Sequence, residues 1–250
     1  MITGELEWTQ IRNNIHPFPL FLRLALFGIA MGLLEAIVVV YLRELYFPAG
    51  FRFPLQFIPE KMLRLETLRE ICTIVMLLAL SAVAAKTFIS RFSVFLFTFG
   101  VWDIFYYVFL KALLGWSDSL LTWDVLFLIP VAWLAPVPAP LITSFTMIGL
   151  ALLYAFLYQR YGTVRFDRPA WLLMALGVII LFFTFIWASA SIVIQGGFYR
   201  DLAGLAHNSA FQAAISSFVP VEFHWGLFGF GEALILASGA LAYRKTSAGR

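Results

Sequence analysis

The sequence predicts an all-α fold: a polytopic bundle of membrane-spanning helices that forms a single domain over residues 1–250. Its composition is 62% hydrophobic and 12% charged, whereas soluble domains are about half apolar and about a quarter charged. The mean hydropathy of +0.91 agrees with a chain that is mostly embedded in a membrane. The third observation is that long apolar stretches recur along the chain, with Arg and Lys residues near their ends.

Seven apolar stretches are predicted to be spanning helices, because crossing about 30 Å of hydrocarbon takes about 20 helical residues. The fourth and fifth are short and meet at residues 136–140, a Pro-Val-Pro-Ala-Pro segment that disfavours helix. We interpret this segment as a tight turn between two spans. The alternative is a re-entrant fourth segment, which leaves six crossings. The stretches are residues 20–42, 68–89, 92–114, 120–135, 141–158, 170–194 and 223–243.

The placement of Lys and Arg favours seven crossings over six. With seven spans, twelve of these residues lie on the face reached after the first span and five on the other face. With six spans, the division is seven against ten. Because Lys and Arg gather on the cytoplasmic side, the stronger asymmetry predicts seven helices. It places the protein in the cytoplasmic (inner) membrane, with the N-terminus outside and the C-terminus in the cytoplasm.

Two connecting regions are predicted to be short helices that lie in the membrane interface. Trp8, Ile11 and Ile15 form an apolar stripe at helical spacing, which indicates an interfacial helix over residues 5–15. A weaker stripe indicates a second helix over about residues 201–217. The first region also belongs to the N-terminal segment 1–19, which precedes the first span.

Acidic residues inside the apolar stretches are the main pointers to function. Ionisable side chains at such depth are costly, and they usually face a protein interior or a water-filled cavity. Three lie deep in their stretches, and two lie nearer one membrane face beside possible countercharges. The deep acids are Glu35, Asp103 and Glu232, the shallower ones are Glu70 and Asp124, and the countercharge candidates are Arg43, Arg69 and Lys111.

The leading functional hypothesis is a carboxylate-lined cavity that binds or transports a proton, a cation or a small polar solute. Buried or clustered carboxyl groups can exchange a proton near neutral pH, and several oxygens together can hold a hard cation. Glu35 or Asp103 would be the protonatable group. The competing interpretation is that each acid neutralises a basic residue on a neighbouring helix and orients the packing.

Two other classes of function stay open. The chain could be a non-catalytic subunit of a larger membrane complex, or a small membrane-embedded enzyme that acts on lipid. His207, Glu222 and His224 form a weak metal-site candidate, because residues two apart on a helix face different directions. No cofactor is expected. The lipid bilayer is the expected partner, with a homo-oligomer or larger complex possible, and a net charge of +3 from scattered residues does not indicate nucleic-acid binding.

Small residues at every fourth position predict close helix packing in two spans. Gly28, Gly32 and Ala36 form such a face beside Glu35. In the last span, the corresponding face beside Glu232 is Gly229, Ala233 and Ala237.

Overall fold

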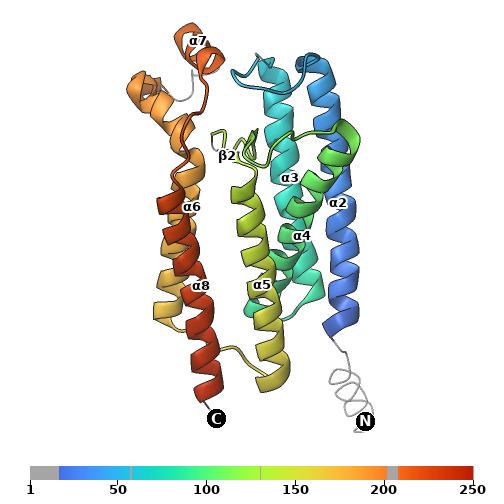
Figure 1. Ribbon diagram of the computed structural model, residues 1–250. Helices are drawn as coiled ribbons and strands as arrows, with labels where there is room; N and C mark the ends of the chain where they lie inside the picture. The colour runs from blue at the N-terminus through green and yellow to red at the C-terminus, as the bar shows by residue number, and fades with distance from the viewer. Residues whose placement is uncertain (1–16, 57, 130, 202–207, 250) are drawn as a thin grey trace.

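The computed structural model describes residues 17–56, 58–129, 131–201 and 208–249, and its described part is mostly helical (Figure 1). Six helices in this part are long and apolar enough to cross a membrane. The prediction of a multi-pass helical membrane protein is confirmed at this level. The six helices are α2 (Pro17–Tyr46), α3 (Glu60–Ala84), α4 (Phe88–Leu114), α5 (Pro138–Tyr161), α6 (Arg168–Gln195) and α8 (Trp225–Ala248).

The predicted fourth span, residues 120–135, is wrong, because this segment contains a β-hairpin. Strand β1 (Trp123–Val125) pairs antiparallel with β2 (Leu134–Pro136). Two features of the sequence account for the difference. Pro130 interrupts the stretch and cannot donate a helix hydrogen bond, and the strand residues include aromatic and β-branched types that favour extended backbone. The count of six spanning helices matches the alternative weighed above, while re-entry of the hairpin into a bilayer stays a prediction.

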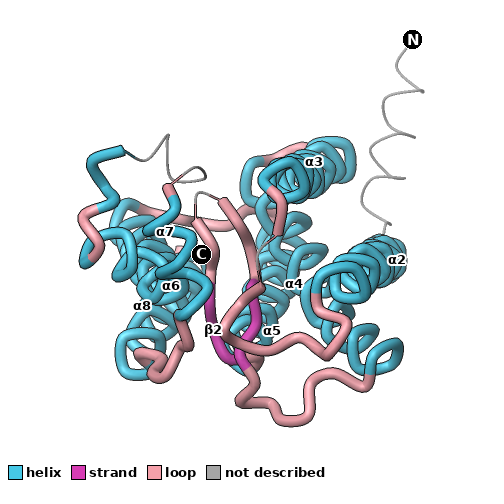
Figure 2. Tube along the Cα trace, turned by 90° about the horizontal axis from the view of Figure 1, so that it is seen from above, coloured by secondary structure: helices cyan, strands magenta, loops and turns pink. Residues whose placement is uncertain are grey.

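The hairpin lies between two groups of helices. Seen from above, its strands run between two helix groups (Figure 2). One group is the pair α6 and α8, and the other contains α4 and α5. On one side the Phe127 ring lies 6.1 Å from the Trp102 ring of α4, measured between centroids. On the other side Trp133 stacks on Phe185 of α6 at 5.9 Å. The hairpin therefore fills the space between the helix groups in the upper part of the bundle in Figure 1.

The two ends of the bundle differ in what they contain. The hairpin, the α2–α3 connection and α7 (Ser209–Ser217) lie toward one end, which we call the hairpin end. Helix α2 begins and α8 ends at the opposite end, which we call the terminal end (Figure 1). The predicted placement of the two termini on opposite sides of the membrane requires an odd number of crossings, and the orientation of the termini stays a prediction.

The predicted interfacial helices are only partly within the described residues. The first, over residues 5–15, lies outside them. In the region of the second, a 3-10 turn covers Phe198–Asp201 and α7 covers Ser209–Ser217. Asn208 caps α7, since its side-chain oxygen accepts hydrogen bonds from the backbone N–H groups of Ala210 and Phe211.

Glycines set the closest helix contacts. Gly28 and Gly32 face α4, and a Cβ atom added at Gly32 would lie 2.8 Å from the Trp102 carbonyl oxygen and 2.9 Å from the Tyr106 nitrogen. The predicted α2 face is therefore a packing surface. The predicted α8 face is wrong, since Gly229 is exposed and Gly231 carries the contact with α6 instead.

We expect Gly32→Ala to destabilise the fold and Gly229→Ala to preserve or stabilise it. The first adds a methyl group against backbone atoms that cannot move aside, at a cost of about 1–3 kcal/mol. The second adds it to open space and gains helix propensity of about 0.5–1 kcal/mol. Unfolding of the purified variants in detergent measures both changes, and equal effects would refute the proposed α2–α4 contact.

Candidate functional site

Glu35 is held by an arginine from the neighbouring helix α3. Arg69 Nη2 donates to Glu35 Oε1 at 3.0 Å and to Glu66 Oε1 at 2.6 Å. Helices α2 and α3 each pack mainly against α4, so this ion pair links two helices that make little other contact. The Glu35 and Arg69 side chains are 13% and 23% exposed. Trp102 Nε1 lies near Glu35 without a hydrogen bond of normal geometry.

A second ion pair joins α2 to the hairpin. Arg43 Nη2 lies 3.2 Å from Asp124 Oδ1, and both side chains are buried, at 8% and 2% exposure. The guanidinium also lies over the rings of Phe51 and Trp116, at 4.3 and 4.1 Å from their centroids. Such cation–π contacts favour a charged arginine away from water. The pair thus fixes the first hairpin strand against the end of α2.

Asp124 has further polar neighbours on α4. The Tyr106 hydroxyl donates to Asp124 Oδ2 at 3.3 Å. The Tyr107 hydroxyl lies near the same carboxylate but makes no hydrogen bond of normal geometry. Burial raises the pKa of Asp124 above its usual range, and the Arg43 charge and the Tyr106 hydrogen bond act in the opposite direction.

Glu70 binds the backbone of the hairpin. Its Oε2 atom accepts a hydrogen bond from the Leu128 N–H at 2.9 Å, and the side chain is buried. Because this N–H belongs to the loop between the strands, neither strand offers it a partner. Glu70 therefore supports the hairpin loop from α3.

Asp103 and Glu232 have hydroxyl partners on α5. Ser144 Oγ donates to Asp103 Oδ2, and Thr143 Oγ1 donates to Glu232 Oε1, each at 2.7 Å. No basic side chain of the described residues lies within ion-pair distance of either acid. The second oxygen of Glu232 is buried without a partner. Consecutive helix residues point about 100° apart, so the two acids lie at similar depth on different sides of α5.

The three deep acids therefore do not form one shared cluster. Glu35 contacts α3, whereas Asp103 and Glu232 contact α5 from different sides. Asp103 still interacts electrostatically with Glu35 and Asp124. Of the countercharge candidates, Arg43 and Arg69 are in the ion pairs above, and Lys111 donates to the backbone carbonyls of Gly115 and Ser117.

The metal-site candidates are not assembled in the part of the chain that the structure covers. His207 lies outside the described residues. Glu222 is exposed, and the His224 ring packs edge-on against Trp187 at 5.1 Å. Within the described ranges, no group of three or more His, Cys, Asp or Glu side chains is arranged to hold a metal ion.

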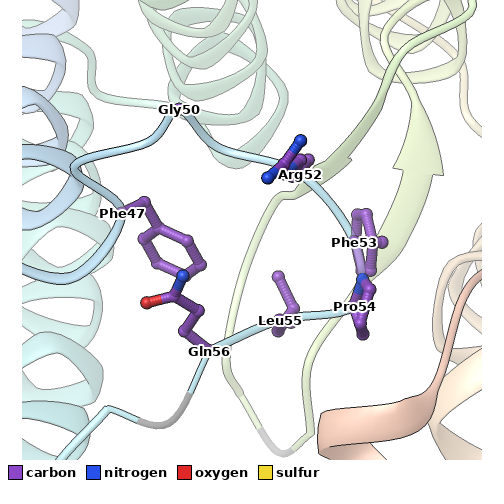
Figure 3. Close-up of a pocket in the computed structure, with 7 residues that line it drawn as sticks. All are labelled: Phe47, Gly50, Arg52, Phe53, Pro54, Leu55 and Gln56. Atoms are coloured by element: carbon purple, nitrogen blue, oxygen red, sulfur yellow. The ribbon is translucent and has the colours of Figure 1, made fainter.

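Two hollows on the surface of the described residues have no acidic residue in their lining. The first, of about 420 Å³, lies in the α2–α3 connection around Phe47, Arg52 and Gln56 (Figure 3). The second, of about 730 Å³, is a groove between α5 and α8. The predicted carboxylate-lined cavity is therefore neither of these hollows.

Comparison with protein-family models, curated proteins and solved structures finds no match to this chain.

Sequence reasoning missed the partners of the acids more than the acids themselves. Thr143 and Ser144 form a polar pair inside an otherwise apolar stretch, which is the signal that could have linked them to Asp103 and Glu232. Glu66 lies three residues before Arg69, a spacing that brings side chains together on a helix. Tyr106 and Leu128 carried no comparable signal, because their roles depend on the position of the hairpin.

We expect Asp124→Asn to destabilise the protein by about 3–5 kcal/mol, because it leaves the buried Arg43 charge without compensation. The matched control is Asp167→Asn. Asp167 pairs with Lys245 at 3.6 Å with both side chains partly exposed, so its loss costs about 0–1 kcal/mol. Asparagine also still caps the helix that Asp167 begins.

Denaturant titration of the two variants in one detergent gives the comparison. Similar losses in both would show that the Arg43–Asp124 pair has no special role in holding the hairpin.

Proposed function

We propose that this chain is a multi-pass membrane protein that binds and carries protons within the membrane, with Asp103 and Glu232 as the protonatable groups. The observation that carries the proposal is the kind of partner that each of these two acids has. Each accepts a hydrogen bond from an α5 hydroxyl, and neither has a basic partner among the described residues. An ionised carboxylate without a countercharge is costly in an apolar interior, and uptake of a proton removes this cost.

The same contacts separate these two acids from the others. Glu35 and Asp124 each lie beside an arginine, a countercharge that Asp103 and Glu232 lack among the described residues. Glu70 accepts its hydrogen bond from a backbone N–H of the hairpin loop instead of a hydroxyl group. The arrangement thus revises the sequence-based choice of protonatable group from Glu35 or Asp103 to Asp103 and Glu232.

A proton fits this arrangement better than a hard metal cation does. Calcium takes about 6–8 oxygen ligands and magnesium an octahedral set. Asp103 and Glu232 contact α5 from different sides, each through one carboxylate oxygen, and the described residues contain no three-group metal cluster. A single carboxyl group with one hydroxyl partner is sufficient for a proton.

Six crossings also suggest an orientation. Ten of the seventeen Lys and Arg residues in the sequence belong to the terminal end when the chain crosses six times. By the positive-inside rule, we propose that this end faces the cytoplasm of the inner membrane, with both termini inside. The ion pairs and the hairpin then lie toward the outer face.

A non-catalytic subunit of a larger membrane complex is the second candidate. The observation that favours it is that Glu35 and Asp124 are neutralised one by one, as expected of acids that orient packing. Under this alternative, Asp103 and Glu232 would exchange no protons. No contact of the described residues specifically favours the enzyme that acts on lipid.

Proton binding is tested with Asp103→Asn and Glu232→Gln. We expect each variant to lose most proton flux in liposomes that contain a pH-sensitive dye, and Asp103→Asn also to remove the infrared band of a protonated carboxyl group. Glu44→Gln is the matched control, because Glu44 is exposed at the hairpin end. It should retain both signals.

Two results would decide against the proposal. One is a wild-type protein that shows no flux and no protonated-carboxyl band. The other is unchanged spectra and flux in both variants while they remain folded. Either result would leave the subunit interpretation.

The orientation is tested with reporter fusions. Alkaline phosphatase fused after Gly50 should be active, because six crossings place the α2–α3 connection outside, and a fluorescent protein fused to the C-terminus should fold in the cytoplasm. The seven-helix topology predicts an inactive phosphatase at the same position. That outcome would reverse the proposed orientation.

A further inference from the structure

A groove runs along the outside of the bundle between α5 and α8. It extends over Ile142–Leu153 on α5 and Leu236–Arg244 on α8, with a volume of about 730 Å³. It exists because both helices place small residues there, Gly149 and Ala240. A Cβ atom added at Gly149 would meet no other atom within 4 Å. The larger side chains on either side, such as Phe145, are exposed and apolar.

The groove matches one leaflet of a bilayer in length and position. The α5 segment from Ile142 to Leu153 rises about 17 Å, and half of the hydrocarbon core is about 15 Å thick. One end of the groove adjoins the Thr143–Glu232 pair, near the middle of the bundle. The other end carries Tyr243 and Arg244, residue types found at headgroup depth.

Charge at the open end of the groove favours an anionic occupant. Arg244 is exposed and has no acidic partner among the described residues. Around it, residues 160–168 and 244–249 contain five basic residues and one acid, Asp167. A second copy of the chain in the same orientation would bring an equally basic end to this position, and like charges repel. A lipid phosphate instead complements it.

We propose that the α5–α8 groove binds one acyl chain of an anionic phospholipid, with the lipid phosphate on Arg244. The apolar walls contact the chain along one leaflet, and the guanidinium can donate two parallel hydrogen bonds to the phosphate oxygens. This inference is independent of the proton proposal, because neither Asp103 nor Glu232 lines the groove.

Purified protein in detergent provides the test. Phosphatidylglycerol and phosphatidylcholine with identical acyl chains are titrated, and the melting temperature gives an apparent affinity for each. We expect phosphatidylglycerol to bind more tightly. Arg244→Gln should weaken its binding about fivefold, the effect of one basic residue at a lipid surface, and remove the preference. Lys86→Gln is the control, an exposed lysine at the same end outside the groove, and should keep the preference.

Filling the groove tests the acyl chain. Gly149→Leu should abolish stabilisation by both lipids while the protein stays folded, because the new side chain enters open space. Ala240→Leu serves the same purpose if the first variant fails to fold. Equal stabilisation by the two lipids in wild type would overturn the proposal. So would a wild-type dimer that Gly149→Leu converts to a monomer with lipid binding intact, since the groove would then hold a partner helix.

Discussion

Backbone groups of the hairpin need hydrogen-bond partners, and this need explains much of the polar chemistry in the bundle. Both strands contain buried residues, and buried non-helical N–H and C=O groups are costly without a hydrogen-bond partner. The Leu128 N–H finds Glu70 on α3, and the Ala132 carbonyl accepts from Ser189 on α6. Within the loop itself, Trp133 Nε1 donates to the Ile129 carbonyl at 2.7 Å. Side chains from both helix groups thus hold the hairpin between them.

The acids of this protein divide into two kinds with different consequences. Glu35, Glu70 and Asp124 join one element to another through arginine or backbone partners, so they define the relative positions of α2, α3 and the hairpin. Among the described residues, Asp103 and Glu232 have hydroxyl partners on α5 and no basic partner. Asp103 and Glu232 make no hydrogen bond to the hairpin among the described residues, so they are free of the structural role of the other three acids.

The sequence predicted the helices well where the pattern was long and uninterrupted. Length and apolar composition were sufficient to predict the six spanning helices, because both are properties of a single segment and do not depend on contacts with other segments. Residues 120–135 were different, since a short apolar stretch with an internal proline suits either a helix or buried extended backbone. Its hairpin structure depends on Glu70, Ser189 and Arg43, which are distant in sequence. The face of α8 was missed because Gly231 has no small residue four positions away, so only its contact with α6 identifies it as the packing glycine.

The acidic residues of the candidate site could be predicted from the sequence, but their hydrogen-bond and ion-pair partners could not. Acids in apolar stretches are conspicuous in a sequence because they are costly. Whether an acid meets arginine, serine or a backbone N–H depends on helix rotation and on the elements that separate the helices. For Asp103, a rotation of α5 by one residue would exchange Ser144 for Thr143.

Arg69 and Glu70 are adjacent residues of α3 that bind two different elements. Arg69 reaches across to Glu35 on α2, and Glu70 reaches the hairpin loop at Leu128. Since α3 has its main helix contact with α4 alone, these two side chains are its chief ties to the remainder of the hairpin end. A sliding or tilting of α3 by a few ångströms would release both ties in one step, so α2, α3 and the hairpin loop are mechanically coupled through a single dipeptide.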